Sequence, residues 1–577
     1  MSSQLDIELQ VAKMNILFIF SAILSIAVAQ QEPSVTCTYF AVGPNLESYG
    51  CDLTINNPGG WNNFSEVRGI HLEGFSNDDL ATIYVDSGIS TNVPSIICET
   101  FPNLISASLY NMGLTNIDDS AFRDCTRLIS LNLAMNRINS ISASAFANLA
   151  NVEFMYLDSN SLATLPENVF ANQGRLTVLD LSFNTFENIP SGIFRPLGML
   201  RNLYLAYCGI TTIDSQWFGS NDVLSYLYLT GNRINVTIDS FVELEQLHTM
   251  IISYNGINNI PSGAFGHMSN LEYLYINGNE LLELPENLFS NLDNLNTLDI
   301  SDNPLREISD GAFRGLDNLD ELGLSNCFLR QMRSSTFEGL SRLTFLSLNF
   351  NDIEELAAGI FAPLINIEYI GLWYNRLKTL RRNIFGEVIT IQTLGLDGNI
   401  INALDRAIID DALILNTLFF NGNLCANDYF GNFLISRDQY LPMLERCFSN
   451  MRYIVDTTTE GDEFAFFDAP QPGIALRVNS DNEVQIALTP FNVIWDPVIE
   501  IFIGAANNTR SIMRVNEETN VVVVPTPNII AQNQWNDFRV TWAHQVVLVF
   551  RGNATFPFMT YTMENFVPVN FYGLKAV

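Results

Sequence analysis

One apolar pattern recurs at a nearly constant interval along more than half of this 577-residue chain. Starting at Leu104 it occurs fourteen times, and twelve of the thirteen intervals between copies are 24 residues long. The clearest copy, residues 128–138, reads L-x-x-L-x-L-x-x-N-x-L. A fixed period of this size predicts a solenoid, because each unit can bury its apolar face only against its neighbours.

The first half of each repeat predicts a short strand whose leucines point inward and whose intervening side chains mostly point out. Asparagine follows at the ninth position in eleven copies: Asn136, Asn160, Asn184, Asn232, Asn255, Asn279, Asn303, Asn351, Asn375, Asn399 and Asn423. A buried amide can satisfy the turn's backbone groups. Cys208 and Cys327 replace it twice. They lie five repeats apart, too far to pair, so we expect buried free thiols.

The second half of the repeat has an aromatic residue at a constant place. The series is Phe122, Phe146, Phe170, Phe194, Phe218, Phe241, Phe265, Phe289, Phe313, Phe337, Phe361 and Phe385, with Ile409 in the thirteenth copy. We expect these rings to form a stacked spine. With Pro166, Pro190, Pro261 and Pro285, the pattern resembles the 24-residue class of extracellular leucine-rich repeats. The resemblance implies an α/β leucine-rich repeat solenoid, a horseshoe with parallel strands on its concave face.

The first 29 residues have the features of a targeting signal. A mostly apolar run over residues 16–29 follows Lys13 and ends in Ala27-Val28-Ala29, which indicates a signal peptide and a secreted, extracellular protein. Either Met1 or Met14 could be the start. No later stretch of 18 continuous apolar residues occurs, so we expect no membrane span. The net charge of −34 disfavours nucleic-acid partners.

We divide the rest of the chain into an N-terminal cap (30–99), the repeats (100–424), a C-terminal cap (425–457) and a last domain (458–577). Six cysteines lie at or near the array ends, where terminal repeats need closing. Six cysteines can pair in 15 different ways. We favour the arrangement with the disulfides Cys37–Cys51, Cys98–Cys125 and Cys425–Cys447. Glycosylation sequons occur at Asn63, Asn235, Asn507 and Asn553.

The last domain has short apolar runs separated by Asn, Gly and Pro. Such spacing predicts a small all-β sandwich-like domain; the runs cover residues 484–488, 499–504, 521–524, 538–542 and 546–550. Four segments of this domain resemble the arthropod domain named after farnesoic acid O-methyltransferase. They cover residues 477–478, 484–489, 500–511 and 535–542. That name implies methyl transfer. However, the domain lacks the glycine-rich strand-to-helix turn that usually binds a methyl donor, and it lacks βαβ alternation.

No catalytic or metal-binding motif stands out elsewhere in the chain. The four histidines, His71, His248, His267 and His544, are scattered, and neither H-E-x-x-H nor G-x-S-x-G occurs. We therefore predict no catalytic residues, no metal and no cofactor, and we expect that the protein is not an enzyme.

Exposed aromatic residues concentrate on the predicted concave face. The partner-binding candidates are Phe154, Tyr156, Tyr204, Tyr226, Tyr228, Tyr254, Tyr273, Tyr275, Tyr369 and Trp373. Strand spacing places Tyr204, Tyr228 and Tyr275 in one row. Cross-strand stacking would explain such rows structurally, and tyrosine and tryptophan are also favoured interface anchors. An extracellular protein, peptide or glycan would suit this surface.

The sequence therefore favours a secreted, non-enzymatic recognition or scaffold protein. One alternative is a non-catalytic stabilising subunit of a secreted enzyme complex, because the pattern also resembles arthropod secreted leucine-rich repeat proteins that include the non-catalytic subunit of a shrimp luciferase. Another is an innate-immune pattern-recognition protein. Formation of homo- or hetero-oligomers stays open.

Overall fold

The computed structural model describes residues 34–42, 48–56, 67–219, 221–387, 389–451, 465–468, 473–478, 484–489, 499–505, 509–515, 519–527, 529, 536–543, 546–551, 554, 556–562 and 571–576. The predicted signal peptide and the glycosylation sequons at Asn63, Asn507 and Asn553 lie outside these residues. The repeats form a parallel β-solenoid of about 14 turns, followed by small antiparallel sheets. The chain divides into two compact units, Met1–Asn279 and Glu280–Val577.

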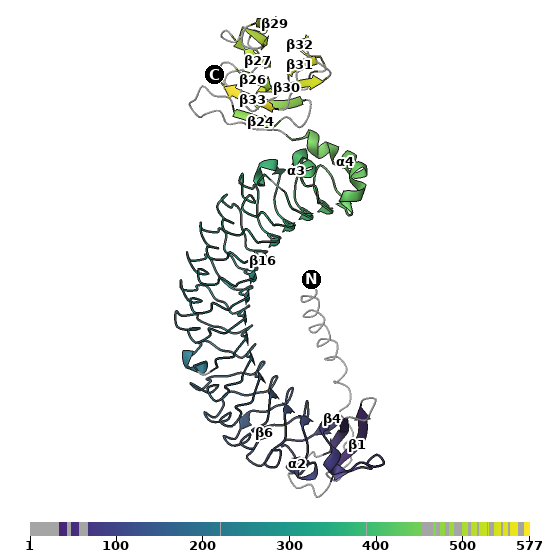
Figure 1. Cartoon of the computed structure of the whole chain (residues 1–577), viewed down its shortest axis with the longest axis vertical. Coiled ribbons are helices and arrows are strands. Elements are labelled where there is room, and N and C mark those ends of the chain that lie inside the picture. The colour runs from purple at the N-terminus through teal and green to yellow at the C-terminus, as the bar shows by residue number, and fades with distance from the viewer. Residues whose placement is uncertain are drawn as a thin grey trace. The chain divides into compact units, whose positions relative to one another are not determined.

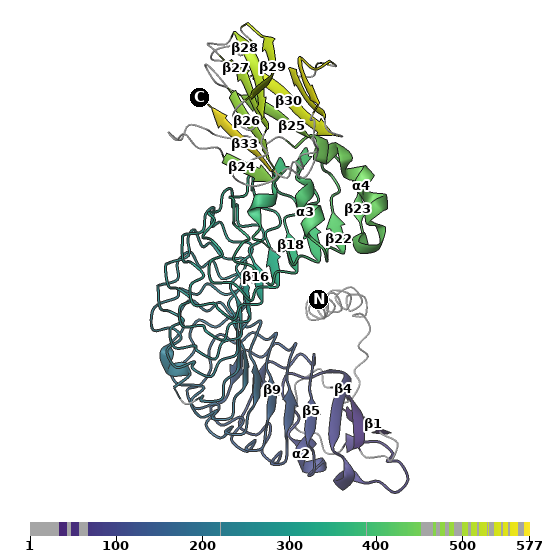
Figure 2. The same cartoon turned by 45° about the horizontal axis from the view of Figure 1, so that its top comes forward.

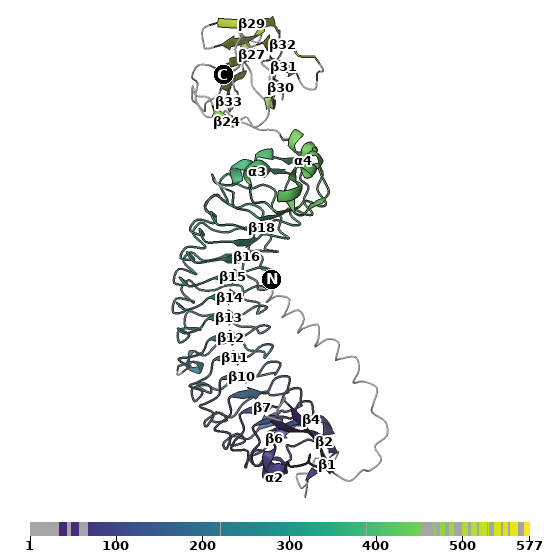
Figure 3. The same ribbon diagram turned by 45° about the vertical axis from the view of Figure 1, so that its right-hand side comes forward.

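The N-terminal unit begins with a cap and continues into eight repeats. Its cap elements are β1 (Ser34–Val42), β2 (Ser48–Asn56), β3 (Val67–Arg68), η1 (Asn77–Asp79), β4 (Thr82–Ile89) and α2 (Ile96–Thr100). Its repeat strands are β5 (Ser106–Ser108), β7 (Ser130–Asn132), β9 (Phe154–Tyr156), β10 (Val178–Asp180), β11 (Asn202–Tyr204), β12 (Tyr226–Tyr228), β13 (Thr249–Ile251) and β14 (Tyr273–Tyr275). The connecting segments contain β6 (Asn116–Ile117), β8 (Ser140–Ile141) and η2 (Ser215–Trp217). Strands β10 to β14 follow one another in chain order (Figure 3).

The 24-residue spacing of the strands extends one strand earlier than the first predicted copy of the repeat. Strand β4 pairs with β5 at the 24-residue offset, with Thr82 opposite Ser106, and it lies in the N-terminal cap (Figure 1). Leu80 and Ile83 are buried where a repeat would place its leucines. In the segment from 67 to 72 only the short strand β3 forms.

Two disulfides, Cys37–Cys51 and Cys98–Cys125, lie in the cap and first repeats, and they join the pairs favoured from the sequence. The first bridge links the antiparallel strands β1 and β2. Strand β2 in turn pairs in parallel with β4. The cap therefore covers the first apolar turn of the ladder with a cross-linked hairpin.

The C-terminal unit continues with six repeats, a cap and the last domain. The repeat strands and connecting elements are β15 (Thr297–Asp299), β16 (Glu321–Gly323), β17 (Phe345–Ser347), β18 (Tyr369–Gly371), β19 (Thr379–Leu380), η3 (Arg382–Ile384), β20 (Thr393–Gly395), β21 (Ala403–Leu404), α3 (Arg406–Asp411) and β22 (Thr417–Phe419). The cap consists of β23 (Tyr429–Phe430) and α4 (Phe433–Ser449), close to β22 and α3 (Figure 2). The Cys425–Cys447 bridge ties α4 to the end of the ladder.

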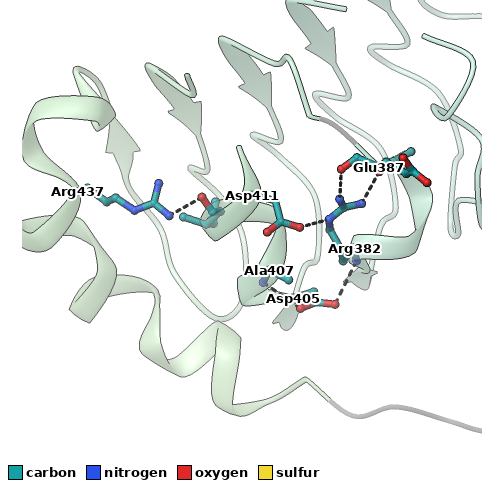
Figure 4. A network of polar contacts seen from close by, with 8 residues as sticks. Arg382, Glu387, Asp405, Ala407, Asp411 and Arg437 are labelled. Atoms are coloured by element: carbon teal, nitrogen blue, oxygen red, sulfur yellow. Dashed lines mark hydrogen bonds and ion pairs between the residues drawn. The ribbon is translucent and has the colours of Figure 1, made fainter. Parts of the chain in front are cut away.

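A polar network joins the last repeats to this cap (Figure 4). The Arg382 guanidinium donates to the Gly386 and Glu387 carbonyls and pairs with Asp411. Arg437 on α4 donates to the Ile409 carbonyl at 2.6 Å and also pairs with Asp410. Arg382 thus links two successive repeats, and Arg437 ties the cap helix α4 to the last of them.

The ninth-position asparagines make the hydrogen-bond ladder that the sequence predicts. In one case, the Asn136 side-chain oxygen accepts from the Met112 and Leu114 amides, at 2.8 and 3.1 Å. Its amide group donates to the Leu109 and Leu133 carbonyls. Each asparagine thus connects its own turn to the preceding repeat.

Cys208 and Cys327 are buried free thiols, as expected. The Cys208 thiol lies 3.2 Å from the Leu181 carbonyl, where an asparagine amide would otherwise donate. Burial raises the pKa of both thiols to about 12, so they stay protonated and unreactive near neutral pH.

The phenylalanine spine is present within each unit. Phe146 stacks on Phe170 with centroids 6.3 Å apart, and Phe337 stacks between Phe313 and Phe361 at 6.4 and 6.1 Å. These rings are almost completely buried. The spine fills the side of each turn opposite the leucines.

The last domain contains two antiparallel sheets that share one hydrophobic core. The first sheet has β24 (Ala465–Asp468), β33 (Phe571–Ala576), β26 (Val484–Thr489), β27 (Ile499–Gly504), β28 (Arg510–Val515) and β29 (Thr519–Pro525). The second has β25 (Gly473–Val478), β30 (Asn536–Ala543), β31 (Val546–Arg551) and β32 (Met559–Thr562). Ile486 and Ile501 from one sheet and Val540 and Val549 from the other lie in the common core. The predicted sandwich-like arrangement is confirmed.

Candidate binding face of the repeats

The third, fifth, seventh and eighth positions of each repeat lie on one side of the ladder, here called the sheet face, and the seventh is buried in several repeats. Strand register in the N-terminal unit aligns two rows. One row is Phe154, Val178, Asn202, Tyr226, Thr249 and Tyr273, and the next is Tyr156, Asp180, Tyr204, Tyr228, Ile251 and Tyr275. The observed register therefore places Tyr204, Tyr228 and Tyr275 in one row, as strand spacing predicts.

Three tyrosines of adjacent strands form a contiguous cluster on this face. The Tyr204 ring lies 5.4 Å from that of Tyr226 and 6.2 Å from that of Tyr228, and the latter two are 6.5 Å apart. Burial, followed by the neighbouring phenols, raises the pKa of Tyr226 above its usual range. The cluster therefore presents half-buried rings that supply apolar area together with hydroxyl groups.

Other predicted residues of the N-terminal unit lie around this cluster with greater exposure. Phe154, Tyr254 and Tyr273 are 36%, 54% and 37% exposed, respectively. Tyr156 is half-buried on the same row as Tyr204, with Asp180 between them. All eight predicted aromatic residues of this unit are thus on one face.

A further aromatic row lies at the eighth repeat position, where the backbone is left-handed in every repeat. Phe183 and Tyr207 have φ near +55° there, and their rings stack at 4.9 Å. The next repeat has Gly231 at this position, and a Cβ on it would overlap the Tyr207 ring. Glycine adopts the positive φ without strain and leaves room for the neighbouring ring. Phe183 is absent from our sequence-based set, although its repeat position could have identified it.

The C-terminal unit has its own aromatic group. Tyr369 stacks on Phe345 with ring centroids 4.4 Å apart and planes at 7°. Trp373 packs edge-on against Phe419 at 5.3 Å and lies over Gly395, which leaves room for the indole. The Trp373 indole N–H is buried and makes no hydrogen bond in the structure. The predicted candidates Tyr369 and Trp373 therefore lie in a second aromatic group, in the other unit.

Two carboxylates accompany the tyrosines of the N-terminal unit. Asp180 is largely buried between Tyr156 and Tyr204, and its carboxylate accepts from the Ser182 amide at 2.9 Å. Burial, with a smaller contribution from Asp180, raises the pKa of Asp158 to about 6. Neither residue was among our sequence-based candidates, because single acidic residues on a strand carry no distinctive pattern.

We expect Asp158→Asn to stabilise the fold at neutral pH. The folded pKa of Asp158, about 6, exceeds the ordinary value of 3.8, so ionisation of this carboxyl group lowers the free energy of unfolding. The cost is complete above about pH 6. It is absent below about pH 4, where the group is protonated in both the folded and the unfolded state. Allowing for partial exposure, the variant should gain about 1–2 kcal/mol at pH 7.5, and this gain should vanish toward pH 4. Denaturant unfolding over this pH range measures it.

Asp119 provides a control for that experiment, because we expect its substitution to change the stability in the opposite direction. Hydrogen bonds from Ser142 and Ser144 lower its pKa, so Asp119→Asn should lose stability near neutral pH and not gain it. A pH-independent gain for the Asp158 variant would contradict the assignment to a buried charge.

The remaining predicted sites are modification and metal sites. The Asn235 side chain is exposed beside Thr237, so it is accessible for glycosylation. Among the described residues, no group of three or more His, Cys, Asp or Glu side chains could hold a metal ion. No helix in the described part of the chain is long and apolar enough to cross a membrane.

Family comparisons agree with this architecture. The leucine rich repeat model matches seven overlapping segments between residues 102 and 377, and the farnesoic acid O-methyl transferase model matches residues 460–577. The chain is a leucine-rich repeat protein with a C-terminal farnesoic acid O-methyltransferase-like domain. No curated protein matches this leucine-rich repeat protein by sequence.

Solved structures show the same repeat fold. A chain of the Drosophila Toll–Spätzle complex is 21% identical over 62% of this protein, with a TM-score of 0.51. A leucine-rich repeat protein of Leptospira interrogans is 22% identical over 64% of this protein and 89% of its own chain, with a TM-score of 0.52. Our leucine-rich repeat protein spans 50% of the Toll-complex chain. At these identities the likeness concerns the fold alone.

Proposed function

We propose that this leucine-rich repeat protein is an extracellular, non-enzymatic recognition protein that binds a partner on its sheet face. The tyrosine cluster of Tyr204, Tyr226 and Tyr228 is the observation that carries this proposal. It is contiguous and half-buried, and it lies on a rigid ladder, so binding would require little reordering. Half-buried tyrosines of this kind are typical anchors of protein interfaces.

Disulfide usage supports the extracellular part of the proposal. The three bridges lie at or near the ends of the array, and such bonds persist in oxidising compartments. The fold of the repeats is also that of a chain in the Toll–Spätzle complex, a structure described as a hub in development and innate immunity. That analogy makes an extracellular protein ligand the first class of partner to test.

The architecture of the last domain supports a role without catalysis. Its described strands pair antiparallel in two sheets, and no described βαβ unit offers the helix N-terminus at which methyl donors usually bind. We propose that this domain adds a second contact for the partner, and that the family name does not describe its activity.

The triple change of Tyr226, Tyr228 and Tyr275 to alanine tests the proposal. We expect partner capture from extracellular fluid to weaken at least about tenfold, because hot-spot rings each contribute more than 1 kcal/mol. The amount of secreted protein should stay unchanged. The control changes the exposed apolar residues Met199, Ile238 and Leu282 to alanine. Identification of the captured protein by mass spectrometry also shows whether it is a catalytic chain.

A second variant separates binding from stacking. Thr249 lies between Tyr226 and Tyr273 in the same row, so Thr249→Lys obstructs the face without removing a ring. We expect this variant to fold and to lose the partner. If both variants retain the partner, the tyrosines serve only to stabilise the sheet and the proposal fails.

A further inference from the structure

The sheet face has a one-sided distribution of charge. In the eight repeats of the N-terminal unit, its four positions contain no Lys, Arg or His, and they contain the acids Asp158 and Asp180. The six repeats of the C-terminal unit likewise have no basic residue at these positions and have Asp299, Asp302, Glu321 and Asp397. The chain as a whole has 28 basic residues, so their exclusion from this face is a local feature.

The two acids of the N-terminal unit are adjacent to the tyrosine cluster. Asp180 on β10 is opposite Tyr156 on β9 and Tyr204 on β11. Asp158 follows Tyr156 by two residues, so it shares the same face and is a diagonal neighbour of Asp180, on the order of 7 Å away. No ion pair to either carboxylate occurs among the described residues. Arg201 and His248 precede strands β11 and β13 at the second repeat position, so they lie outside the four positions of the sheet face.

We propose that Asp158, Asp180 and the Tyr204–Tyr226–Tyr228 cluster bind an arginine or lysine side chain on an extended segment of a partner polypeptide. This inference rests on the proposed function and specifies the chemistry of its partner. A cation here would meet two carboxylates on one side and tyrosine rings on the other. Both interactions strengthen in a partly desolvated site. The net charge of −34 would also attract a cationic segment before contact.

The energetics of the free protein support this assignment. Burial disfavours both carboxylates in their charged form. The titratable groups that interact with Asp158 are Asp180 from β10 and Tyr156 from β9, and neither of them is cationic. A partner cation would restore the missing countercharge. A neutral glycan could donate hydroxyl hydrogen bonds to these carboxylates but would bring no countercharge, and an anionic glycan would be repelled.

The test compares two peptides and two charge-matched variants of the full-length protein. The probes are a fluorescent Gly/Ser-rich peptide with several arginines and the same peptide with citrulline at each arginine. Citrulline keeps the shape and removes the charge. Asp158→Asn with Asp180→Asn removes two sheet-face charges and keeps the acceptor for the Ser182 amide. The control, Glu187→Gln with Asp239→Asn, removes two exposed charges from the connecting segments.

We expect the arginine peptide to bind the unchanged protein and the control alike, and to bind the Asp158/Asp180 variant about tenfold more weakly by fluorescence anisotropy. The citrulline peptide should bind weakly to all three. Binding of the arginine peptide should also fall between about pH 7.5 and about pH 5, because protonation removes the charge of Asp158.

Three results would overturn the inference. They are equal binding of both peptides to the unchanged protein, equal weakening by the control variant, and unchanged binding by the Asp158/Asp180 variant. Capture of the natural partner distinguishes this inference from the proposed function. If the tyrosine variant loses the partner and the carboxylate variant keeps it, the face is a binding site without a cation subsite. If the tyrosine variant keeps the partner, the proposed function itself is wrong.

Discussion

Asn232→Ala is expected to lower the free energy of unfolding by about 3–5 kcal/mol, because it leaves several buried backbone groups without partners. The Asn232 side-chain oxygen accepts from the amides of Cys208 and Ile210, at 2.9 and 3.0 Å. Its amide group donates to the Leu205 and Leu229 carbonyls, both at 2.8 Å. The residue is only 4% exposed, so water cannot replace these bonds without opening the turn.

Chemical denaturation followed by circular dichroism measures this loss. The control is Asn139→Ala, which removes an exposed asparagine of a connecting segment and should change stability by less than about 0.5 kcal/mol. Asn232→Cys should be less damaging than the alanine variant. A thiol fills this position naturally in two repeats, and that of Cys208 contacts the Leu181 carbonyl. A loss near 1 kcal/mol or less for the alanine variant would contradict the role of the ladder.

Phe337→Ala should destabilise the C-terminal unit by about 3–5 kcal/mol. The ring is completely buried and stacks on Phe313 and Phe361 in the two neighbouring repeats. Removing it leaves a cavity between three turns, and repeat stability depends on the interfaces between neighbours. The loss should therefore appear as earlier unfolding in denaturant.

Phe328→Ala is the matched control, since this phenylalanine precedes Phe337 by nine residues and is 50% exposed. We expect it to change the unfolding midpoint little. Phe337→Leu should recover part of the stability, because leucine fills much of the same volume. Equal losses for the buried and exposed phenylalanines would show that the spine has no special role.

The strongest sequence-based expectations concern features that repeat. A 24-residue period leaves one way to bury Leu, Asn and Phe at constant positions, so the ladder, the asparagine bonds and the spine all agree with the pattern. The five apolar runs of the last domain likewise correspond to strands β26, β27, β29, β30 and β31. Strands β24, β25, β28, β32 and β33 were not among these runs, and β28 and β32 mix polar and apolar residues along their length.

The candidate site was only partly predictable for a physical reason. Aromatic residues at strand positions are visible in the sequence, and their rows follow from the strand spacing. The extra strand β4 was missed because it precedes the regular copies, although Leu80 and Ile83 already follow the spacing. Phe183 was missed because only the left-handed turn at the eighth position shows that its ring returns to stack on Tyr207.

By itself the sequence determined the repeat architecture, since periodic burial is a property of residue spacing alone. It also identified most of the aromatic residues that lie on the sheet face. Only the tertiary structure decided which of them meet, because the distances between Tyr204, Tyr226 and Tyr228 depend on rotamers and strand register. It alone placed Asp158 and Asp180 together without a basic neighbour, because burial and pairing are relations between repeats distant in sequence.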